Sequence, residues 1–187
     1  MTPILIAGAG TIGRTVAQWL HFSGDYAVHL VDINPITEPT DPAITCTQLD
    51  IENTQSLQQY VKKHSIHAII STLPYFCNIR LAQFAQHNQL HYFDPTEDTN
   101  VTATIAAFAQ QHHTAFVPQC GLAPGYIDII ANNYIQEFDE VEKVKLRCGA
   151  LPANTSHALH YAFTWSPDGL INEYINPCEI LDNGKLS

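Results

Sequence analysis

The chain has 187 residues, 45% of them hydrophobic, and its 18 acidic side chains outnumber its 8 Lys and Arg, giving a net charge of −10. This length suits one ordinary domain, or one domain with part of a second. The negative charge opposes binding to nucleic acids and anionic membranes, and no apolar run approaches the roughly 18 residues that span a bilayer.

The first residues carry the most information. Ile4–Ala7 is a short apolar run, typical of a strand, and it leads directly into Gly8-Ala9-Gly10-Thr11-Ile12-Gly13, a G-x-G-x-x-G motif. Such a turn brings main-chain N–H groups and a helix N-terminus to a pyrophosphate. The residues expected to hold a dinucleotide here are Gly8, Gly10, Thr11, Ile12 and Gly13.

A helix is predicted after the motif, with one face formed by Ile12, Val16, Trp19 and Leu20. Ala27–Val31 then reads as a second strand that ends at Asp32. A carboxylate at that point accepts hydrogen bonds from the adenosine ribose hydroxyls and repels a 2′-phosphate. The sequence therefore favours NAD over NADP.

Strand and helix signals continue to alternate to about residue 118, after a Pro- and Thr-containing loop at Asn34–Pro42. Further strands are predicted at Ile44–Thr47, His67–Ser71, His91–Asp94 and Thr114–Val117, and helices near Thr54–Lys63, Phe76–His87 and Glu97–Gln111. This alternation is typical of an α/β, doubly wound parallel sheet of the Rossmann type, with strand order 3-2-1-4-5-6.

Ligands of such sheets collect at the carboxyl ends of the strands. The side chains predicted at those ends are Asp32, Asp50, Ser71, Thr72, Leu73, Pro74, Asp94 and Cys120. Each is a candidate for the site, and each is also compatible with an ordinary cap or turn.

The pattern changes after Cys120. Gly121–Gly125 is a turn-rich joint, a helix is predicted over Tyr126–Phe138, and Val141–Cys148 alternates like a half-exposed strand. Ser166 and the following Pro predict a short helix to about Tyr174, and Asn183-Gly184 predicts a hairpin turn that the chain ends too early to complete. We therefore expect a nucleotide-binding domain over 1–120 and an incomplete α+β substrate domain over 121–187.

Five segments together resemble the saccharopine dehydrogenase family, which includes saccharopine reductases, lysine 6-dehydrogenases and carboxynorspermidine-type dehydrogenases. They are the glycine motif, Ser71-Thr72-Leu73-Pro74-Tyr75, Tyr92-Phe93-Asp94, Cys120-Gly121-Leu122-Ala123-Pro124-Gly125 and the segment from Trp165 to Tyr174. The last two are the most specific. Because family members are considerably longer, the chain is expected to be either a fragment or a natural short form.

The resemblance implies a role for each matching position. Gly8–Gly13 would hold the pyrophosphate and Asp32 the ribose, with Asp50 and Ile51 near the adenine. Ser71–Pro74 would line the nicotinamide ribose, and Cys120 and Gly121 would border the nicotinamide ring. The family also implies a homodimer with a small amino-acid or polyamine substrate, bound between the two domains.

Amine oxidation by this family needs a base, and Asp94 is the best candidate, although a helix cap fits it equally well. Tyr75 is a possible donor to the substrate, with packing beside Pro74 the more ordinary role. Arg147 is a candidate for a substrate carboxylate, with a solvated strand face as the default. Packing against the cofactor suits Cys120 better than nucleophilic chemistry, because no neighbouring His supports a thiolate.

No metal site is expected, since the three closely spaced His pairs lack a third ligand nearby; the pairs are His64/His67, His87/His91 and His157/His160. The five cysteines are widely spaced without a C-x-x-C motif, and the first strand begins at residue 3, which together favour a reduced, cytoplasmic protein without a signal peptide. The sequence thus favours an NAD-dependent oxidoreductase acting on a C–N bond. The alternative is a non-catalytic NAD(H)-binding module or fragment.

Overall fold

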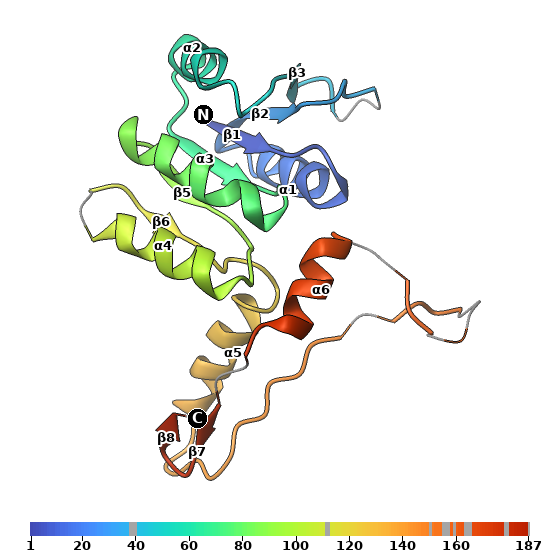
Figure 1. Ribbon diagram of the computed structural model, residues 1–187, viewed down its shortest axis with the longest axis vertical. Coiled ribbons are helices and arrows are strands. Elements are labelled where there is room, and N and C mark those ends of the chain that lie inside the picture. Colours follow the sequence, from blue (N-terminus) through green and yellow to red (C-terminus); the bar gives the residue numbers. More distant parts are fainter. Residues whose placement is uncertain are drawn as a thin grey trace.

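A computed structural model of the chain describes residues 1–37, 41–110, 113–149, 151–154, 158, 160–162, 166–177 and 180–186 (Figure 1). Gln111, His157 and Trp165, which the sequence analysis names, lie outside these ranges, as does Cys178, one of its five cysteines. Among the helices of the described part, none is long and apolar enough to cross a membrane.

Six parallel strands form one sheet in the order β3-β2-β1-β4-β5-β6, which confirms the predicted fold class and strand order. The strands are β1 (Thr2–Ala7), β2 (Tyr26–Asp32), β3 (Thr45–Gln48), β4 (Ala68–Ser71), β5 (His91–Phe93) and β6 (Phe116–Val117). The helices between them are α1 (Thr11–Phe22), α2 (Thr54–His64), α3 (Tyr75–His87) and α4 (Thr99–Ala109).

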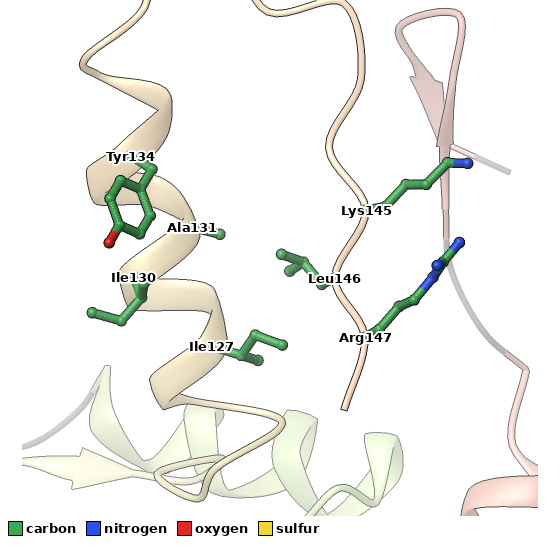
Figure 2. A pocket seen from close by; sticks show the side chains of 7 residues that line it. All are labelled: Ile127, Ile130, Ala131, Tyr134, Lys145, Leu146 and Arg147. Atoms are coloured by element: carbon green, nitrogen blue, oxygen red, sulfur yellow. The ribbon is translucent and has the colours of Figure 1, made fainter. Parts of the chain in front are cut away.

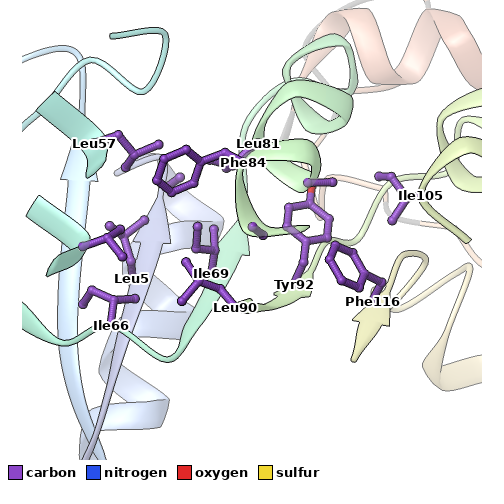
Figure 3. Close-up of a cluster of buried hydrophobic side chains, with 14 of the residues drawn as sticks. Leu5, Leu57, Ile66, Ile69, Leu81, Phe84, Leu90, Tyr92, Ile105 and Phe116 are labelled. Carbon is purple, nitrogen blue, oxygen red and sulfur yellow. The ribbon is translucent and has the colours of Figure 1, made fainter. Parts of the chain in front are cut away.

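The two faces of the sheet carry separate apolar cores, because side chains alternate along each strand. Leu5 and Ile69 face α2 and α3, in a cluster that continues through Tyr92 and Phe116 to Ile105 on α4 (Figure 3). On the opposite face Ile4, Ile6 and Leu30 pack with Ala17 of α1. Three helices therefore cover one face, and α1 covers the other over β1 and β2.

The predicted apolar face of α1 is only partly correct: Val16 and Leu20 pack against the core, but Ile12 and Trp19 do not. Gly13 and Ala17 are the buried residues of the helix, whereas Trp19 is 75% exposed and Ile12 47% exposed. Small side chains let the helix axis approach the sheet closely, and this orientation turns the larger Trp19 toward solvent.

Two helix boundaries also differ from the prediction. Asp98 accepts a hydrogen bond from the Val101 N–H (2.7 Å), and this cap starts α4 at Thr99 instead of Glu97. The helix after the joint, α5, covers Tyr126–Ile135 and ends before Phe138.

The segment after α5 departs further from the prediction. The expected strand over 141–148 has no ladder partner among the described residues, so its alternating pattern produces no sheet. The hairpin is complete: β7 (Leu181–Asp182) pairs with β8 (Lys185–Leu186), because Asn183 and Gly184 both adopt positive φ and a two-residue turn needs little chain. Before it lies α6 (Pro167–Ile175).

His29 is a buried polar residue between β2 and α2. Its Nδ1 lies 3.0 Å from the Tyr60 hydroxyl, and its ring centroid lies 4.7 Å from that of His64. Burial, and to a lesser degree the neighbouring His64, lowers the pKa of His29 below 6.5. The folded protein therefore holds this imidazole neutral at a pH where the unfolded chain already binds a proton.

Acidification is expected to destabilise the fold through His29. The stabilising contribution of its neutral form is full above the ordinary pKa of about 6.5 and is lost as pH falls from there through the lower folded-state pKa. Urea unfolding at pH 8 and pH 5.5 measures this loss, which should be smaller in His29→Gln than in the wild type. His87→Gln, at an exposed position, is the control, and an equal loss in His29→Gln and wild type would contradict the assignment.

Candidate functional site

The glycine loop lies between β1 and α1 and is packed too tightly for side chains. Gly8 has φ +104° and donates its N–H to the Val31 carbonyl (2.8 Å). A Cβ on Gly13 would lie 1.9 Å from the Gly8 carbonyl oxygen, and one on Gly8 would lie 2.8 Å from Thr72 Oγ1. The motif therefore brings α1 close against the ends of β1 and β4.

The opposite side of the loop is open. A Cβ on Gly10 would have no heavy atom within 4 Å, and no side chain caps the N-terminus of α1. The first N–H groups of a helix have no intrahelical acceptor, so those of Thr11 and Ile12 are oriented to receive an anion. Open space beside an uncapped helix N-terminus fits the pyrophosphate of a dinucleotide.

Asp32 lies beside this loop. Its Oδ2 accepts a hydrogen bond from the Ala9 N–H (2.8 Å) and its Oδ1 one from the Asn34 N–H (2.9 Å). The carboxylate thus ties the end of β2 to the glycine loop. Oδ1 also accepts from the Asn34 side-chain amide (3.3 Å), whereas Oδ2 has a further lone pair that can accept a hydroxyl donor from a ligand.

Thr72 supports the loop from β4. Its hydroxyl lies 3.0 Å from both the Ala7 and Gly8 carbonyl oxygens, and its N–H donates to Ala7. Ser71 is fully buried and donates its hydroxyl to Asn78 Oδ1 on α3 (2.7 Å). These two predicted ribose contacts therefore have structural roles in this conformation.

The other predicted residues near β3 and β4 are placed in turns. Asp50 accepts a hydrogen bond from the Glu52 N–H (2.9 Å) just before α2, and Ile51 is half-buried against the core. Leu73 packs partly on the same core and Pro74 precedes α3. Tyr75 packs there too, with its ring edge-on to Phe76, in agreement with the ordinary packing role.

Asp94 follows β5 and is completely buried. Its Oδ1 accepts the Thr96 N–H (2.8 Å), whereas its Oδ2 has no hydrogen-bond partner among the described residues. Burial raises the pKa of Asp94, and the bond from the Thr96 N–H, together with the nearby Tyr92 hydroxyl, which makes no hydrogen bond of ordinary geometry, offsets part of this rise. The cap of α4 is Asp98, so the carboxyl of Asp94 is left for another role.

Cys120 is brought against Asp94 by the end of β6. Its N–H (2.9 Å) and its thiol (3.1 Å) both donate to the Asp94 carbonyl oxygen. Although Cys120 is accessible to solvent, desolvation of the thiol, and next the Asp94 charge, raises its pKa. A thiol held in its neutral form is a poor nucleophile.

Gly121 begins the joint to α5. A Cβ there would lie 3.2 Å from Pro95 Cβ and from the Pro124 oxygen, so the joint lies directly against the turn that follows Asp94. The described residues contain no group of three or more His, Cys, Asp or Glu arranged to hold a metal.

Three residues support the site although the sequence analysis assigned them no role there, even where, as for Tyr92 and Asn172, they lie in segments that resemble the family. Asn78 and Tyr92 occur within ordinary helix and strand patterns. Asn172 of α6 donates its Nδ2 to Asp98 Oδ2 (3.0 Å), 74 residues away in the chain. Contacts of this kind depend on tertiary packing and are invisible to local spacing rules.

The chain also has a shallow cavity of about 350 Å³ beside α5 (Figure 2). Leu146 points from the extended 145–147 segment toward Ile127 and Ala131, whereas Lys145 and Arg147 point away from the helix. This arrangement agrees with the default interpretation of Arg147 as a solvated residue.

Two family models match the chain. The saccharopine dehydrogenase NADP binding domain matches residues 4–118, and the saccharopine dehydrogenase C-terminal domain matches residues 121–187.

Curated relatives include an alpha-aminoadipic semialdehyde synthase of Arabidopsis thaliana, 24% identical over 98% of this chain and 20% of its own length. A saccharopine dehydrogenase (NADP(+), L-glutamate-forming) of Schizosaccharomyces pombe is 23% identical over 100% of this chain and 43% of its own. The apo saccharopine dehydrogenase (L-Glu forming) structure from Saccharomyces cerevisiae matches with TM-score 0.69 and 21% identity, over 100% of this chain and 44% of that one. The chain therefore spans less than half the length of these relatives.

Alanine at Gly13 should destabilise the fold, whereas alanine at Gly10 should leave its stability almost unchanged. Gly13→Ala forces a methyl group against the Gly8 carbonyl oxygen, and we expect the free energy of unfolding to fall by about 1–3 kcal/mol. Gly10→Ala adds the same group in open space, so its change should stay within about 0.5 kcal/mol. Urea unfolding of both variants measures the difference, and equal losses would show that the loop is not packed as described.

Proposed function

The chain belongs to the saccharopine dehydrogenase family, and from this membership we propose that it binds a nicotinamide dinucleotide and serves in oxidation of a C–N bond in an amino-acid or polyamine substrate. The observation that carries the proposal is the open face of the glycine loop beside the uncapped N-terminus of α1. Gly10, Thr11 and Ile12 supply N–H groups to the pyrophosphate, and Asp32 is beside them for the ribose. When bound, the nicotinamide supplies the hydride acceptor.

We propose NAD as the preferred cofactor. The family model and the S. pombe relative carry NADP in their names, which favours the opposite choice. This chain, however, has no Lys or Arg between Arg14 and Lys62, and its β2 ends in Asp32. A 2′-phosphate beside that carboxylate would meet repulsion without a cation from this stretch to balance it.

Calorimetric titration with NAD, NADH, NADP and NADPH tests the proposed preference for NAD over NADP. NAD(H) should bind at least about tenfold more tightly than NADP(H), a difference of about 1.4 kcal/mol. Asp32→Asn should narrow that ratio, because it removes the charge while retaining a similar shape. Tighter binding of NADP(H) by the wild type would overturn the preference, and no binding of any of the four would overturn the proposed function.

Asp94 is proposed as the group that accepts the amine proton. Its Oδ2 has no partner in the described part of the chain, and burial raises its pKa toward the range in which a carboxylate is an effective base. Since Asp94 is completely covered in this conformation, the neighbouring side chains must move for a substrate nitrogen to reach it. Cys120 and Gly121 border the same region and are proposed to contact the nicotinamide end of the cofactor.

Asp94→Asn should separate binding from chemistry. We expect NADH formation from amine substrates such as lysine or saccharopine to fall by about 10²–10⁴-fold, with affinity for the dinucleotide within about twofold of wild type. NADH absorbance and calorimetry provide the two measurements. Full activity in Asp94→Asn would remove it as the base, and absence of turnover in a wild type that binds tightly would favour the non-catalytic alternative.

The family also leads us to propose a homodimer in the cytoplasm. Large apolar side chains on α5, including Ile129 (69% exposed) and Tyr134 (57% exposed), would supply part of such an interface. Gel filtration at several concentrations measures the oligomeric state.

A further inference from the structure

The turn between β5 and α4, residues 94–98, is unusually buried for a polar segment. Asp94, Thr96 and Asp98 are 0%, 4% and 6% exposed. Its first residue is fixed by the bonds from Cys120 to the Asp94 carbonyl, and its last by the bond from the Val101 N–H to Asp98 Oδ1. The conformation of Asp94 therefore depends on contacts at both ends of this turn.

The remaining carboxyl oxygen of Asp98 is bound by α6. Asn172 donates its Nδ2 to Asp98 Oδ2 at 3.0 Å, and both residues are buried. The contact joins the family's C-terminal segment to the nucleotide-binding segment across 74 positions of the chain.

Among the described residues, apolar packing contributes little to holding α6 in place. Its buried residues are Gly169 and Asn172, whereas Ile171, Tyr174 and Ile175 are 57%, 85% and 73% exposed. Leu170 is half-buried, but because the other large apolar side chains of the helix remain exposed, apolar burial contributes little to its position. The described residues between α5 and α6 also contain no helix or strand that would hold it from the side.

The carboxyl groups around the Asn172 amide favour a neutral hydrogen-bond donor at this position. Glu97 and Asp98 lie on the turn, and Glu173 is its neighbour on α6, so three carboxyl groups surround the contact. Burial, and then the Glu173 and Asp98 charges, raises the pKa of Glu97, while a hydrogen bond from the Asn172 side chain lowers it. A neutral donor is therefore tolerated at position 172, and a fourth carboxylate would be repelled.

From this geometry we infer that Asn172 is a positioning residue: its amide attaches α6 to turn 94–98 and thereby sets the position of the Asp94 carboxyl. The significance of Asp94 as a base rests on the proposed function, but the attachment of α6 to the turn does not. α6 is thus connected to the turn that carries the proposed base through a buried polar contact.

Asn172→Asp tests this in the full chain, because it replaces the donor with a carboxylate of nearly the same shape. Asn172→Ala removes the donor without adding charge, and Asn133→Asp makes the same chemical change at an exposed position of α5. Hydrogen exchange with peptide resolution should show at least a tenfold loss of protection in α6 and in turn 94–98 for Asn172→Asp. Asn172→Ala should show a smaller loss in the same segments, and Asn133→Asp no change.

The pH dependence distinguishes repulsion from general unfolding. Burial raises the pKa of Glu97 and of Glu173, so these two carboxyl groups lose their charge earlier than exposed ones as the pH is lowered, and the repulsion of the new carboxylate weakens. Protection of α6 in Asn172→Asp, relative to Asn133→Asp, should therefore recover as the pH is lowered from 7 toward 5. Protection of the glycine loop should stay at the wild-type level throughout. Unchanged α6 protection in Asn172→Asp, or loss of protection across the whole sheet, would overturn the attachment.

The effect on Asp94 is measured without turnover. A ¹³C titration of the Asp94 carboxyl, assigned with Asp94→Asn, should show a shifted midpoint in Asn172→Asp and Asn172→Ala but not in Asn133→Asp. An unchanged midpoint would overturn the positioning role even if α6 were released. Failure to bind any dinucleotide would contradict the proposed function and leave both of these measurements valid.

Discussion

The close approach of α1 to the sheet is the constraint on which the rest of the structure depends. The Gly13 Cα is so near the Gly8 carbonyl that a methyl group there would lie 1.9 Å from the oxygen. This approach turns the first N–H groups of α1 toward the space above Gly10, and it brings Asp32 and Thr72 within hydrogen-bond distance of the same loop. The main-chain groups proposed to bind the dinucleotide lie together because three strands and one helix meet at glycines.

Sequence patterns were sufficient for the sheet but not for every helix face. The glycine motif and the apolar runs identified the order of the strands, since a parallel sheet requires strands that are apolar on both faces. The orientation of α1 was not predictable from apolar periodicity, because the residues that bury most deeply are small and Trp19 is not among them. The 141–148 segment shows the same limit: alternation describes what a strand prefers, but a strand also needs a partner.

The site was predictable as an edge of the sheet and less so as a set of side chains. The topological rule directs attention to the carboxyl ends of the strands, yet it does not distinguish side chains that face a ligand from those that support the loop. Ser71 and Thr72 are engaged with Asn78 and with the β1 carbonyl groups. Asn172 lies far away in the chain, and no spacing rule connects it with Asp98.

Burial is distributed unequally along the chain, and this has a consequence for function. Residues 1–118 contain both apolar cores, whereas α5 has no buried residue and most large apolar side chains of α6 are exposed. Every residue proposed to contact the pyrophosphate and ribose belongs to the first part, so dinucleotide binding draws on a well-packed core. The proposed base is different, because the turn that carries it is also held by α6. The proposed cofactor binding and the proposed chemistry therefore depend on parts of the chain that are packed to different degrees, so that a change in the second part would affect the chemistry while binding is retained.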